Sequence, residues 1–437
     1  MLNFTPTRRE VLKIAGAGVA AGTTAAACSR LDRASTNEQG PRGGNQAGGS
    51  GAGGSGAGGS GAGSGRGRAL VVIELGGGND GLSMLAPVGH GRYHDARPTV
   101  ALAGKEVEDW GDGWGLHKSL AQLQQFGLAA LHGVGTHEPD LSHFEMTARW
   151  QAGTPRALGP AGTGFLGRLS DQLAGDELLT AVSLDLGQNP ALISDRSRTS
   201  GLAIDSGLGI LEVGSEETQR RVARAFNALA ESLLSSGTVG SESAAEVRRA
   251  TGAGLDGMLA IATLLRTLPD PETEFPETDF GTQLRLASQL LRSDSGFRII
   301  HIPMNGGSFD THDNHRDQHN QNMTLLGDGL AAFGAELAAL GMEHEVLTAT
   351  VSEFGRRFEE NSGGLDHGTA STALMLGPVA PGMHGEPPSL KRLDEDSNLI
   401  ATLEFDRYLA TMAQWMSVDP EAVLAGAPRG VEGLLTA

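Results

Sequence analysis

The sequence predicts an α/β fold: a doubly wound, mostly parallel sheet in three layers, α/β/α, with a helical insertion. Short apolar runs recur along the chain, as at 69–75, 297–303 and 345–351, and such runs are typical of strands buried on both faces. Longer segments with one apolar helical face separate many of them, which favours parallel strands joined by crossover helices. Asp, Glu or His residues also follow several strands on Gly-rich loops, where an open α/β sheet presents ligand groups.

Residues 1–28 resemble a twin-arginine export signal with a possible lipobox. Arg8 and Arg9 precede a weakly apolar run, 14–27, which is too short to span a bilayer stably. Three alanines then precede Cys28, which would be acylated in a lipoprotein; ordinary signal-peptidase cleavage at the same place is the alternative. The predicted partners are the twin-arginine translocation machinery and a lipid anchor at Cys28, and the predicted location is the periplasm or a membrane surface.

Residues 29–68 are predicted to be a disordered Gly/Ser-rich linker, and residues 69–437 a single α/β domain. The unit Gly-Ala-Gly-Gly-Ser repeats within the linker. A segment of this composition cannot bury apolar surface and behaves as a flexible coil. The linker would therefore tether a folded body to a membrane.

The charge of the chain excludes some classes of function. The 437 residues hold 33 Lys and Arg against 52 Asp and Glu, a net charge of −19. A protein this acidic repels phosphate backbones, so we expect no nucleic-acid partner. Cys28 is the only cysteine, which excludes both an intramolecular disulfide and a catalytic thiol in the body.

The first predicted strand, 69–75, leads into three glycines and then Asp80. Glycine permits tight turns and the close approach of a ligand. Asp80 is therefore a candidate metal ligand at the tip of this strand. An Asx-type turn with Gly81 explains the same residues equally well.

A second strand, 128–135, is followed by Ser142, which with Glu145 fits a capping box and predicts a helix from Ser142 to about Ala152. A cap is the favoured role of Ser142. A nucleophilic role stays open, because a helix N-terminus stabilises an oxyanion. His143 in the same segment is expected to be an ordinary helix-end histidine.

The central stretch is the strand 297–303 with the polar loop behind it, which carries Asp310 and His312. Carboxylate and imidazole groups this close together suit zinc, manganese or a similar divalent ion. A simple helix-capping loop is the alternative. A helix from about Asp317 to Leu340 follows. If that helix begins early enough, His315 and His319 share one of its faces.

A further strand, 345–351, leads into Glu353, Arg356 and Arg357, and a Gly-rich loop then presents Asp366 and His367 before the strand 371–376. Glu353, Asp366 and His367 are thus further candidate metal ligands. Either arginine could bind an anion. The alternative is that both are exposed and pair with Glu359 and Glu360.

The remaining elements are a strand at 180–186 and the helical insertion at about 205–295. Helices are expected from Ser215, from about Ala244 to Leu268, and from Gly281 to Leu291. We expect the insertion to pack on the sheet, and it contains no motif.

Five short motifs occur in an order that resembles a bacterial family, domain of unknown function 1501. They are Gly77-Gly78-Asn79-Asp80-Gly81-Leu82, Ser142-His143-Phe144, Gly307-Ser308-Phe309-Asp310-Thr311-His312, Ser352-Glu353-Phe354-Gly355-Arg356 and Asp366-His367-Gly368. The resemblance covers about residues 69–420. Members of this family are commonly exported by the twin-arginine route and look like relatives of alkaline phosphatases and sulfatases, which implies an alkaline-phosphatase-like fold.

The wider superfamily implies a role for each matching residue. Asp80 would be the first-strand metal carboxylate, and Ser142 lies near the position of the nucleophile. Asp310, His312 and His367 resemble the ligands of one metal site. Glu353 stands where the superfamily usually has an Asp-His pair, and this departure removes a nitrogen ligand from the second metal site.

Two functions follow from these residues. The first is an exported, metal-dependent hydrolase that acts on a phosphate or sulfate ester, carried by a small molecule or a polymer. A bound metal would act as Lewis acid, Ser142 as nucleophile and Arg356 as anion clamp. The alternative is a non-catalytic periplasmic or surface protein that serves in binding or assembly and keeps a degenerate metal site.

Overall fold

A computed structural model describes residues 67–154, 162–175, 179–185, 189–197, 199–202, 264–265, 267–293, 295–304 and 308–436. Its centre is a nine-stranded sheet in the order β11-β5-β10-β9-β1-β8-β6-β7, with β12 paired to β5 beside this path. The strands are β1 (Ala69–Glu74), β5 (Leu128–Gly135), β6 (Ala181–Ser183), β7 (Thr199–Gly201), β8 (Ile299–Pro303), β9 (Val346–Val351), β10 (Ser371–Leu376), β11 (Gly382–His384) and β12 (Leu403–Glu404).

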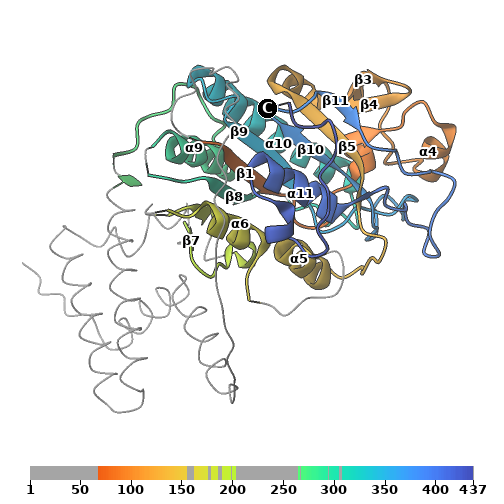
Figure 1. Ribbon diagram of the computed structural model, residues 1–437. Helices are drawn as coiled ribbons and strands as arrows, with labels where there is room; N and C mark the ends of the chain where they lie inside the picture. The colour runs from red at the N-terminus through yellow and green to blue at the C-terminus, as the bar shows by residue number, and fades with distance from the viewer. Residues whose placement is uncertain are drawn as a thin grey trace, which may run out of the picture.

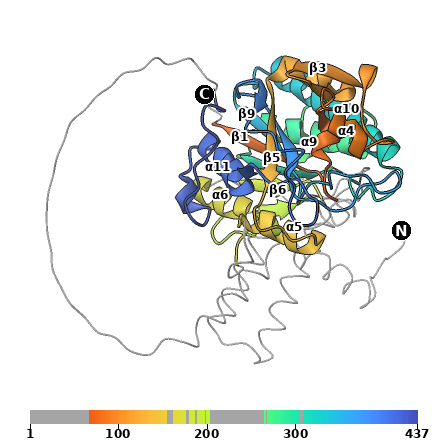
Figure 2. The same ribbon diagram turned by 90° about the vertical axis from the view of Figure 1, so that its right-hand side faces the viewer.

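The central strand β1 explains the three layers, because both of its faces are apolar and each is covered by helices. Val71 and Ile73 face one core with helices α9 (Asp279–Arg292) and α10 (His315–Ala339). Leu70 and Val72 face the other core, which α5 (His143–Ala152), α6 (Phe165–Leu173) and α11 (Phe405–Trp415) cover. Figures 1 and 2 show these two groups of helices on opposite sides of the sheet. The predicted α/β/α fold class is confirmed.

The sheet is mostly parallel, as predicted, and β10 is the exception. β1 runs parallel to β8 and β9, whereas β10 runs antiparallel to both β5 and β9. No crossover helix separates β9 from β10, so the chain returns through a loop and the two strands pair antiparallel. A single antiparallel strand is compatible with the predicted, mostly parallel sheet.

The predicted elements of the sheet core are present with small shifts. β1, β5, β8, β9 and β10 lie within or close to their predicted ranges, as do α5, α9 and α10. The strand expected at 180–186 is shorter, since β6 covers Ala181–Ser183. The helices expected between residues 203 and 263 lie outside the described residues.

Several small elements were not expected. A three-stranded antiparallel sheet, β2-β4-β3, and two short helices follow β1. They comprise α3 (Gly81–Met84), β2 (Leu85–Ala86), α4 (Gly91–Ala96), β3 (Val107–Gly111) and β4 (Trp114–His117), with 3-10 segments at Gly104–Glu106, Lys118–Phe126, Pro190–Leu192 and Pro420–Ala422.

Among the described residues, no helix combines the length and the apolar character needed to cross a membrane. The signal predicted at 1–28 and the linker predicted at 29–68, apart from its last two residues, lie outside the described residues.

Candidate metal centre

The candidate site lies where β1, β8 and β9 end, and backbone hydrogen bonds join the loops that follow these strands. The amide of Phe309, after β8, donates to the Gly76 carbonyl at 3.0 Å. Gly77 has a φ of +108°, and a Cβ atom there would lie 2.5 Å from the Asp310 nitrogen. Only glycine fits both this backbone conformation and this close approach. The glycines after β1 therefore allow the loop that carries Asp310 to lie directly beside them.

Four side chains meet at this point, and we call them the imidazole cluster: His143, Asp310, His312 and His367. The Nε2 atom of His312 lies 3.0 Å from Asp310 Oδ1, and those of His143 and His367 lie 3.4 Å from the same oxygen. The Nε2 atoms of His312 and His367 are 3.0 Å apart. Three imidazoles thus present the same ring nitrogen to one carboxylate.

The hydrogen bonds behind the rings determine which nitrogen carries the proton. Nδ1 of His143 faces Glu353 Oε1 at 2.8 Å, and Nδ1 of His312 faces Asp366 Oδ1 at 2.9 Å. Nδ1 of His367 faces the Leu141 carbonyl at 2.7 Å. Carbonyls and ionised carboxylates only accept hydrogen bonds, so each neutral ring places its proton on Nδ1 and a lone pair on Nε2. Three lone pairs then point at an anionic oxygen, an arrangement that a cation would stabilise.

The geometry fits a small divalent ion. Zinc bonds to nitrogen and oxygen at about 2.0–2.1 Å, so neighbouring ligands of a tetrahedral zinc are about 3.3–3.4 Å apart. The separations from Asp310 Oδ1, 3.0 to 3.4 Å, lie at or slightly below this spacing. The ligand atoms of His143, Asp310 and His367 all lie within 4.8 Å of one another. His312 lies beside this group of three, with Nε2 at 3.0 Å from both Asp310 Oδ1 and His367 Nε2. Within the part of the chain that the structure describes, the buried His143 Nε2 has no hydrogen-bond partner. Imidazole ligands held by carboxylates or carbonyls through Nδ1 are the usual arrangement around zinc.

Charged neighbours determine the ionisation of the cluster. Partial burial alone would raise the pKa of Asp310, but its hydrogen bond to Arg356 and the charge of Arg356 hold the pKa below its ordinary value. The hydrogen bond to Glu353 raises the pKa of His143. The hydrogen bond from His312 lowers the pKa of Asp366. Asp310 is therefore ionised at neutral pH and available to a cation.

Arg356 positions the loops of the site. Its side chain is fully buried and donates to the carbonyls of Gly78 at 2.9 Å, Leu365 at 2.9 Å and Gly77. A fourth hydrogen bond, of 2.6 Å, reaches Asp310 Oδ1. The expectation that Arg356 is exposed and pairs with Glu359 or Glu360 was wrong. As an anion clamp it would have to act from this buried position.

Asp80 does not join the imidazole cluster. Its carboxylate is buried and accepts from Arg97 at 2.6 and 3.0 Å, with His315 Nε2 at 3.4 Å. Burial would raise the pKa of Asp80, yet the charges of Arg97 and His315 hold it well below the ordinary value. Arg97 thus supplies the counter-charge at the tip of the first strand. His315 and His319 do share a helix face, with ring centroids 5.0 Å apart, but both are buried. His315 faces Asp80, and His319 faces Asn79 Oδ1 at 3.2 Å.

Glu353 and Asp366 lie one layer behind the cluster, where they orient its imidazoles. Glu353 Oε1 accepts from the Gly77 amide at 2.8 Å as well as facing His143. Asp366 faces His312 and also accepts from Asn361 at 3.3 Å. Of the predicted ligands, the structure thus brings Asp310, His312 and His367 into direct contact, with Glu353 and Asp366 behind them.

Ser142 occupies the N-cap position of α5, but its side chain makes no capping hydrogen bond. The Glu145 carboxylate pairs with Arg149 at 2.9 Å instead of accepting from the Ser142 backbone amide, so the predicted capping box is not formed. Ser142 lies between Leu141, whose carbonyl faces His367, and His143 of the cluster. Ser142 is therefore next to a cluster residue in the chain, and its hydroxyl does not cap the helix.

His143 is the residue of the cluster that sequence reasoning missed. A single histidine at a helix start carries no spacing signal, and its partners lie far away in the chain. Its place directly after Ser142, in a motif shared with the family, was the available signal.

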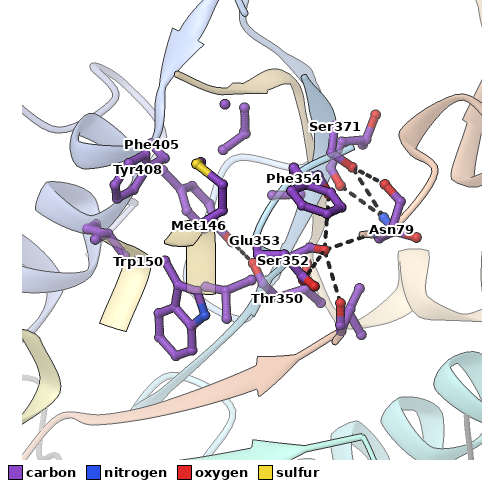
Figure 3. A pocket seen from close by; sticks show the side chains of 17 residues that line it. Asn79, Met146, Trp150, Thr350, Ser352, Glu353, Phe354, Ser371, Phe405 and Tyr408 are labelled. Atoms are coloured by element: carbon purple, nitrogen blue, oxygen red, sulfur yellow. Dashed lines mark hydrogen bonds between the residues drawn. The ribbon is translucent and has the colours of Figure 1, made fainter. Parts of the chain in front are cut away.

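A small cavity, shown in Figure 3, adjoins the cluster at Glu353, which lines the cavity and faces His143. Met146, Trp150, Phe405 and Tyr408 form one side of it, and polar residues that include Asn79, Ser352 and Ser371 form the other. Its volume is about 40 Å³. The cavity extends from the site toward the core on the α5 side of the sheet.

Comparison with known proteins gives a family and several distant structures. The model of a family described as "Protein of unknown function (DUF1501)" matches residues 117–432. No curated protein matches the chain.

The chain is similar to solved structures at low identity. A sulfatase from Pseudoalteromonas sp. is 11% identical, with 84% of this chain and 71% of that chain covered and a TM-score of 0.36. A protein in the alkaline phosphatase superfamily from Vibrio parahaemolyticus is 9% identical, with 82% and 69% covered and a TM-score of 0.38. A lipoteichoic acid synthase from Listeria monocytogenes is 7% identical, with 85% and 76% covered and a TM-score of 0.38. Likenesses this weak carry no inference about activity.

Proposed function

Because the chain belongs to the DUF1501 family, whose description gives no activity, we propose a function from the site itself: an exported, metal-dependent hydrolase of phosphate or sulfate esters. The observation that carries the proposal is the convergence of three Nε2 atoms on Asp310 Oδ1, within 3.0 to 3.4 Å. His143, Asp310, His312 and His367 would hold the metal.

The surroundings of the cluster suit the hydrolysis of an anionic ester. The side chains of Asp310 and His312 are 40% and 47% exposed, so a substrate can reach them from solvent. A bound divalent metal would supply Lewis acidity, which neutralises charge on the ester oxygens. Arg356 keeps Asp310 ionised, and Glu353 and Asp366 fix the tautomers of His143 and His312. Ser142, beside His143, is the candidate nucleophile of this chain.

The proposal is tested by metal analysis combined with an ester panel. Purified protein should contain zinc or a similar metal at one equivalent per chain. Its activity on aryl phosphates or sulfates should be lost with a chelator and restored by the metal. His367→Ala should lose both metal and activity, while His344→Ala, at a surface histidine whose side chain is 86% exposed, should keep both. Wild-type protein that binds no metal when the metal is supplied at micromolar concentration would contradict the proposal.

A second function is a non-catalytic binding or assembly protein that keeps this metal site. The observation that favours it is the ion pair of Arg97 with the Asp80 carboxylate. Among the described residues, a single group, formed by His143, Asp310 and His367, then remains that could hold a metal. In that case the zinc content would be the same, yet no ester of the panel would be hydrolysed. Export by the twin-arginine route belongs to both proposals and rests on residues 1–28. Replacing Arg8 and Arg9 by lysine should retain the protein in the cytoplasm.

A further inference from the structure

A larger cavity, of about 290 Å³, lies at the opposite end of the sheet from the imidazole cluster. It is lined by Val346, the first residue of β9, whereas Asp310 of the cluster follows the end of β8. Both strands run parallel to β1, so their beginnings and their ends lie at opposite edges of the sheet. Gly127, directly before β5, and Gly377, directly after the antiparallel β10, also line this cavity. The cavity is therefore separate from the candidate metal centre.

Helix α10 and the sheet form the walls of the cavity, and both contribute apolar side chains. Leu330, Phe333 and Leu337 recur at spacings of three and four residues, so they lie on one face of α10. Val346 and Leu376 contribute from β9 and β10. All five belong to one hydrophobic core and are at most 6% exposed. The interior of the cavity therefore favours an apolar group.

The size of the cavity indicates how large that apolar group is. Protein cores rarely leave voids larger than a water molecule, whereas pockets of this size with mostly apolar walls are typical of small-molecule sites. An engineered apolar cavity of roughly 150 Å³ binds benzene. The cavity of this protein, at about 290 Å³, is nearly twice as large. It thus suits an apolar body of about eight to twelve heavy atoms.

One end of the cavity is electronegative. Glu343 lines it, and so do Leu337 and Ala338 in the last turn of α10, where the carbonyl end of the helix carries a partial negative charge. No Lys or Arg lies in that turn or among the described residues that line the cavity. His344 lies beside Glu343, at 3.9 Å, with 86% of its side chain exposed to solvent. A positively charged group at this end would be stabilised, and a carboxylate would be repelled.

We propose that this cavity binds an amphipathic cation, with an apolar body of about eight to twelve heavy atoms and an ammonium group at one end. The apolar body lies between α10 and β9, against Phe333 and Val346, and the ammonium group lies beside Glu343 at the end of α10. The site goes beyond the proposed function, because it shares no residue with the imidazole cluster. It is a second ligand site, whose occupation does not depend on a metal.

Isothermal titration calorimetry with three probes of equal chain length tests the proposal. Full-length protein is titrated with n-octylammonium, n-octanol and n-octanoate, each below the concentration at which it forms micelles. We expect n-octylammonium to bind at one equivalent per chain, about three- to fivefold more tightly than n-octanol, and n-octanoate to bind more weakly than either. Glu343→Gln should remove the advantage of the ammonium group and leave the affinity for n-octanol unchanged.

Two neighbouring alanines provide matched variants, because Ala338 lines the cavity and Ala339 does not, while both are exposed at the end of α10. Ala338→Trp should obstruct the cavity and weaken the binding of n-octylammonium by about tenfold or more, whereas Ala339→Trp should bind it as the wild type does. Thermal melts of the free proteins show that both variants are folded.

Three results would overturn the site: no saturable binding of n-octylammonium, binding of several equivalents per chain, or equal affinities of Ala338→Trp and the wild type. Binding of n-octanoate as tight as that of n-octylammonium would overturn the assignment of a cation.

Discussion

At the scale of single residues, the site depends on groups that stand behind the metal ligands. Glu353 joins the Gly77 amide to the His143 ring, at 2.8 Å on each side, and its side chain is only 4% exposed. Carboxylates in this position fix the ring orientation and make the opposite nitrogen a better ligand. The role of Glu353 is thus to position His143.

Removal of this carboxylate should weaken metal binding without abolishing it. We expect Glu353→Gln to lower zinc affinity by about 10–100-fold, the usual effect of losing such a partner, because the amide no longer favours the proton on Nδ1. Competition with a chelating dye measures the affinity. His143→Ala, which removes the ligand itself, should lower it further. Equal affinities for Glu353→Gln and the wild type would show that His143 needs no such partner.

Asp80 illustrates what the sequence reveals about single residues and what it does not. Asp310, His312 and His367 could be proposed because polar residues directly after strands meet at one sheet edge. The same reasoning selected Asp80, but the structure pairs that carboxylate with Arg97. Arg97 lies in a segment without a clear pattern, so nothing in the sequence placed its side chain there.

The Asp80–Arg97 pair should be a stabilising element whose loss is costly. Both side chains are almost fully buried, at 1% and 0% exposure, so Asp80→Ala leaves a buried guanidinium without its partner. We expect a loss of about 3–5 kcal/mol in the free energy of unfolding, measured by urea denaturation. Asp95→Ala on the exposed face of α4 is the control, with an expected change within about 0.5 kcal/mol. A loss of under about 1 kcal/mol for Asp80→Ala would contradict a buried, mutually dependent pair.

At the scale of elements, backbone contacts between loops determine where the ligands lie. The loops after β1 and β8 meet at Gly76, Gly77 and Phe309, and the loop after β9 is joined to that of His367 by an amide of Arg357 that donates to the Asp366 carbonyl at 3.0 Å. The positions of the long strands along the chain could be predicted from their apolar runs. The antiparallel pairing of β10 could not, because an apolar run does not reveal strand direction. The small sheet β2-β4-β3 could not, because its strands are only two to five residues long and lack a strong pattern.

Gly77 provides the sharpest test of this arrangement. In Gly77→Ala, the new Cβ would lie 2.5 Å from the Asp310 nitrogen, at a φ of +108° that L-residues avoid. We expect about 1–3 kcal/mol of destabilisation and a loss of zinc affinity as the Asp310 loop moves away. Gly76→Ala is the matched control, because a Cβ there meets nothing within 4 Å. Thermal melts and zinc titration measure both effects, and similar behaviour of the two variants would contradict the close approach.

At the scale of the whole molecule, the described residues form a large sheet covered by helices on both faces, as Figures 1 and 2 show. The imidazole cluster lies on the loops that follow its strands. The fold class and the family were predictable, because they depend on repeated patterns and ordered motifs. Stability against acid is another property of the whole molecule, and a buried histidine away from the site contributes to it.

His132 should make the fold sensitive to acid. Burial lowers the pKa of His132 from 6.5 to about 4, and its ring lies 4.5 Å from that of Trp114. Between these pKa values the unfolded chain binds a proton that the folded chain does not, so stability is complete above pH 6.5 and falls as the pH drops toward 4. We expect a loss of about 3 kcal/mol from this residue across that range. Urea denaturation at several pH values should show a smaller loss for His132→Phe, and an equal loss would contradict this role.

The most direct measurement for the metal centre is anomalous X-ray diffraction from crystals grown with zinc. The account predicts one strong anomalous peak about 2.0–2.1 Å from the Nε2 atoms of His143, His312 and His367 and bound by the Asp310 carboxylate. A peak bound by Asp80, or no peak between the three imidazoles when zinc is present at a saturating concentration, would contradict the account.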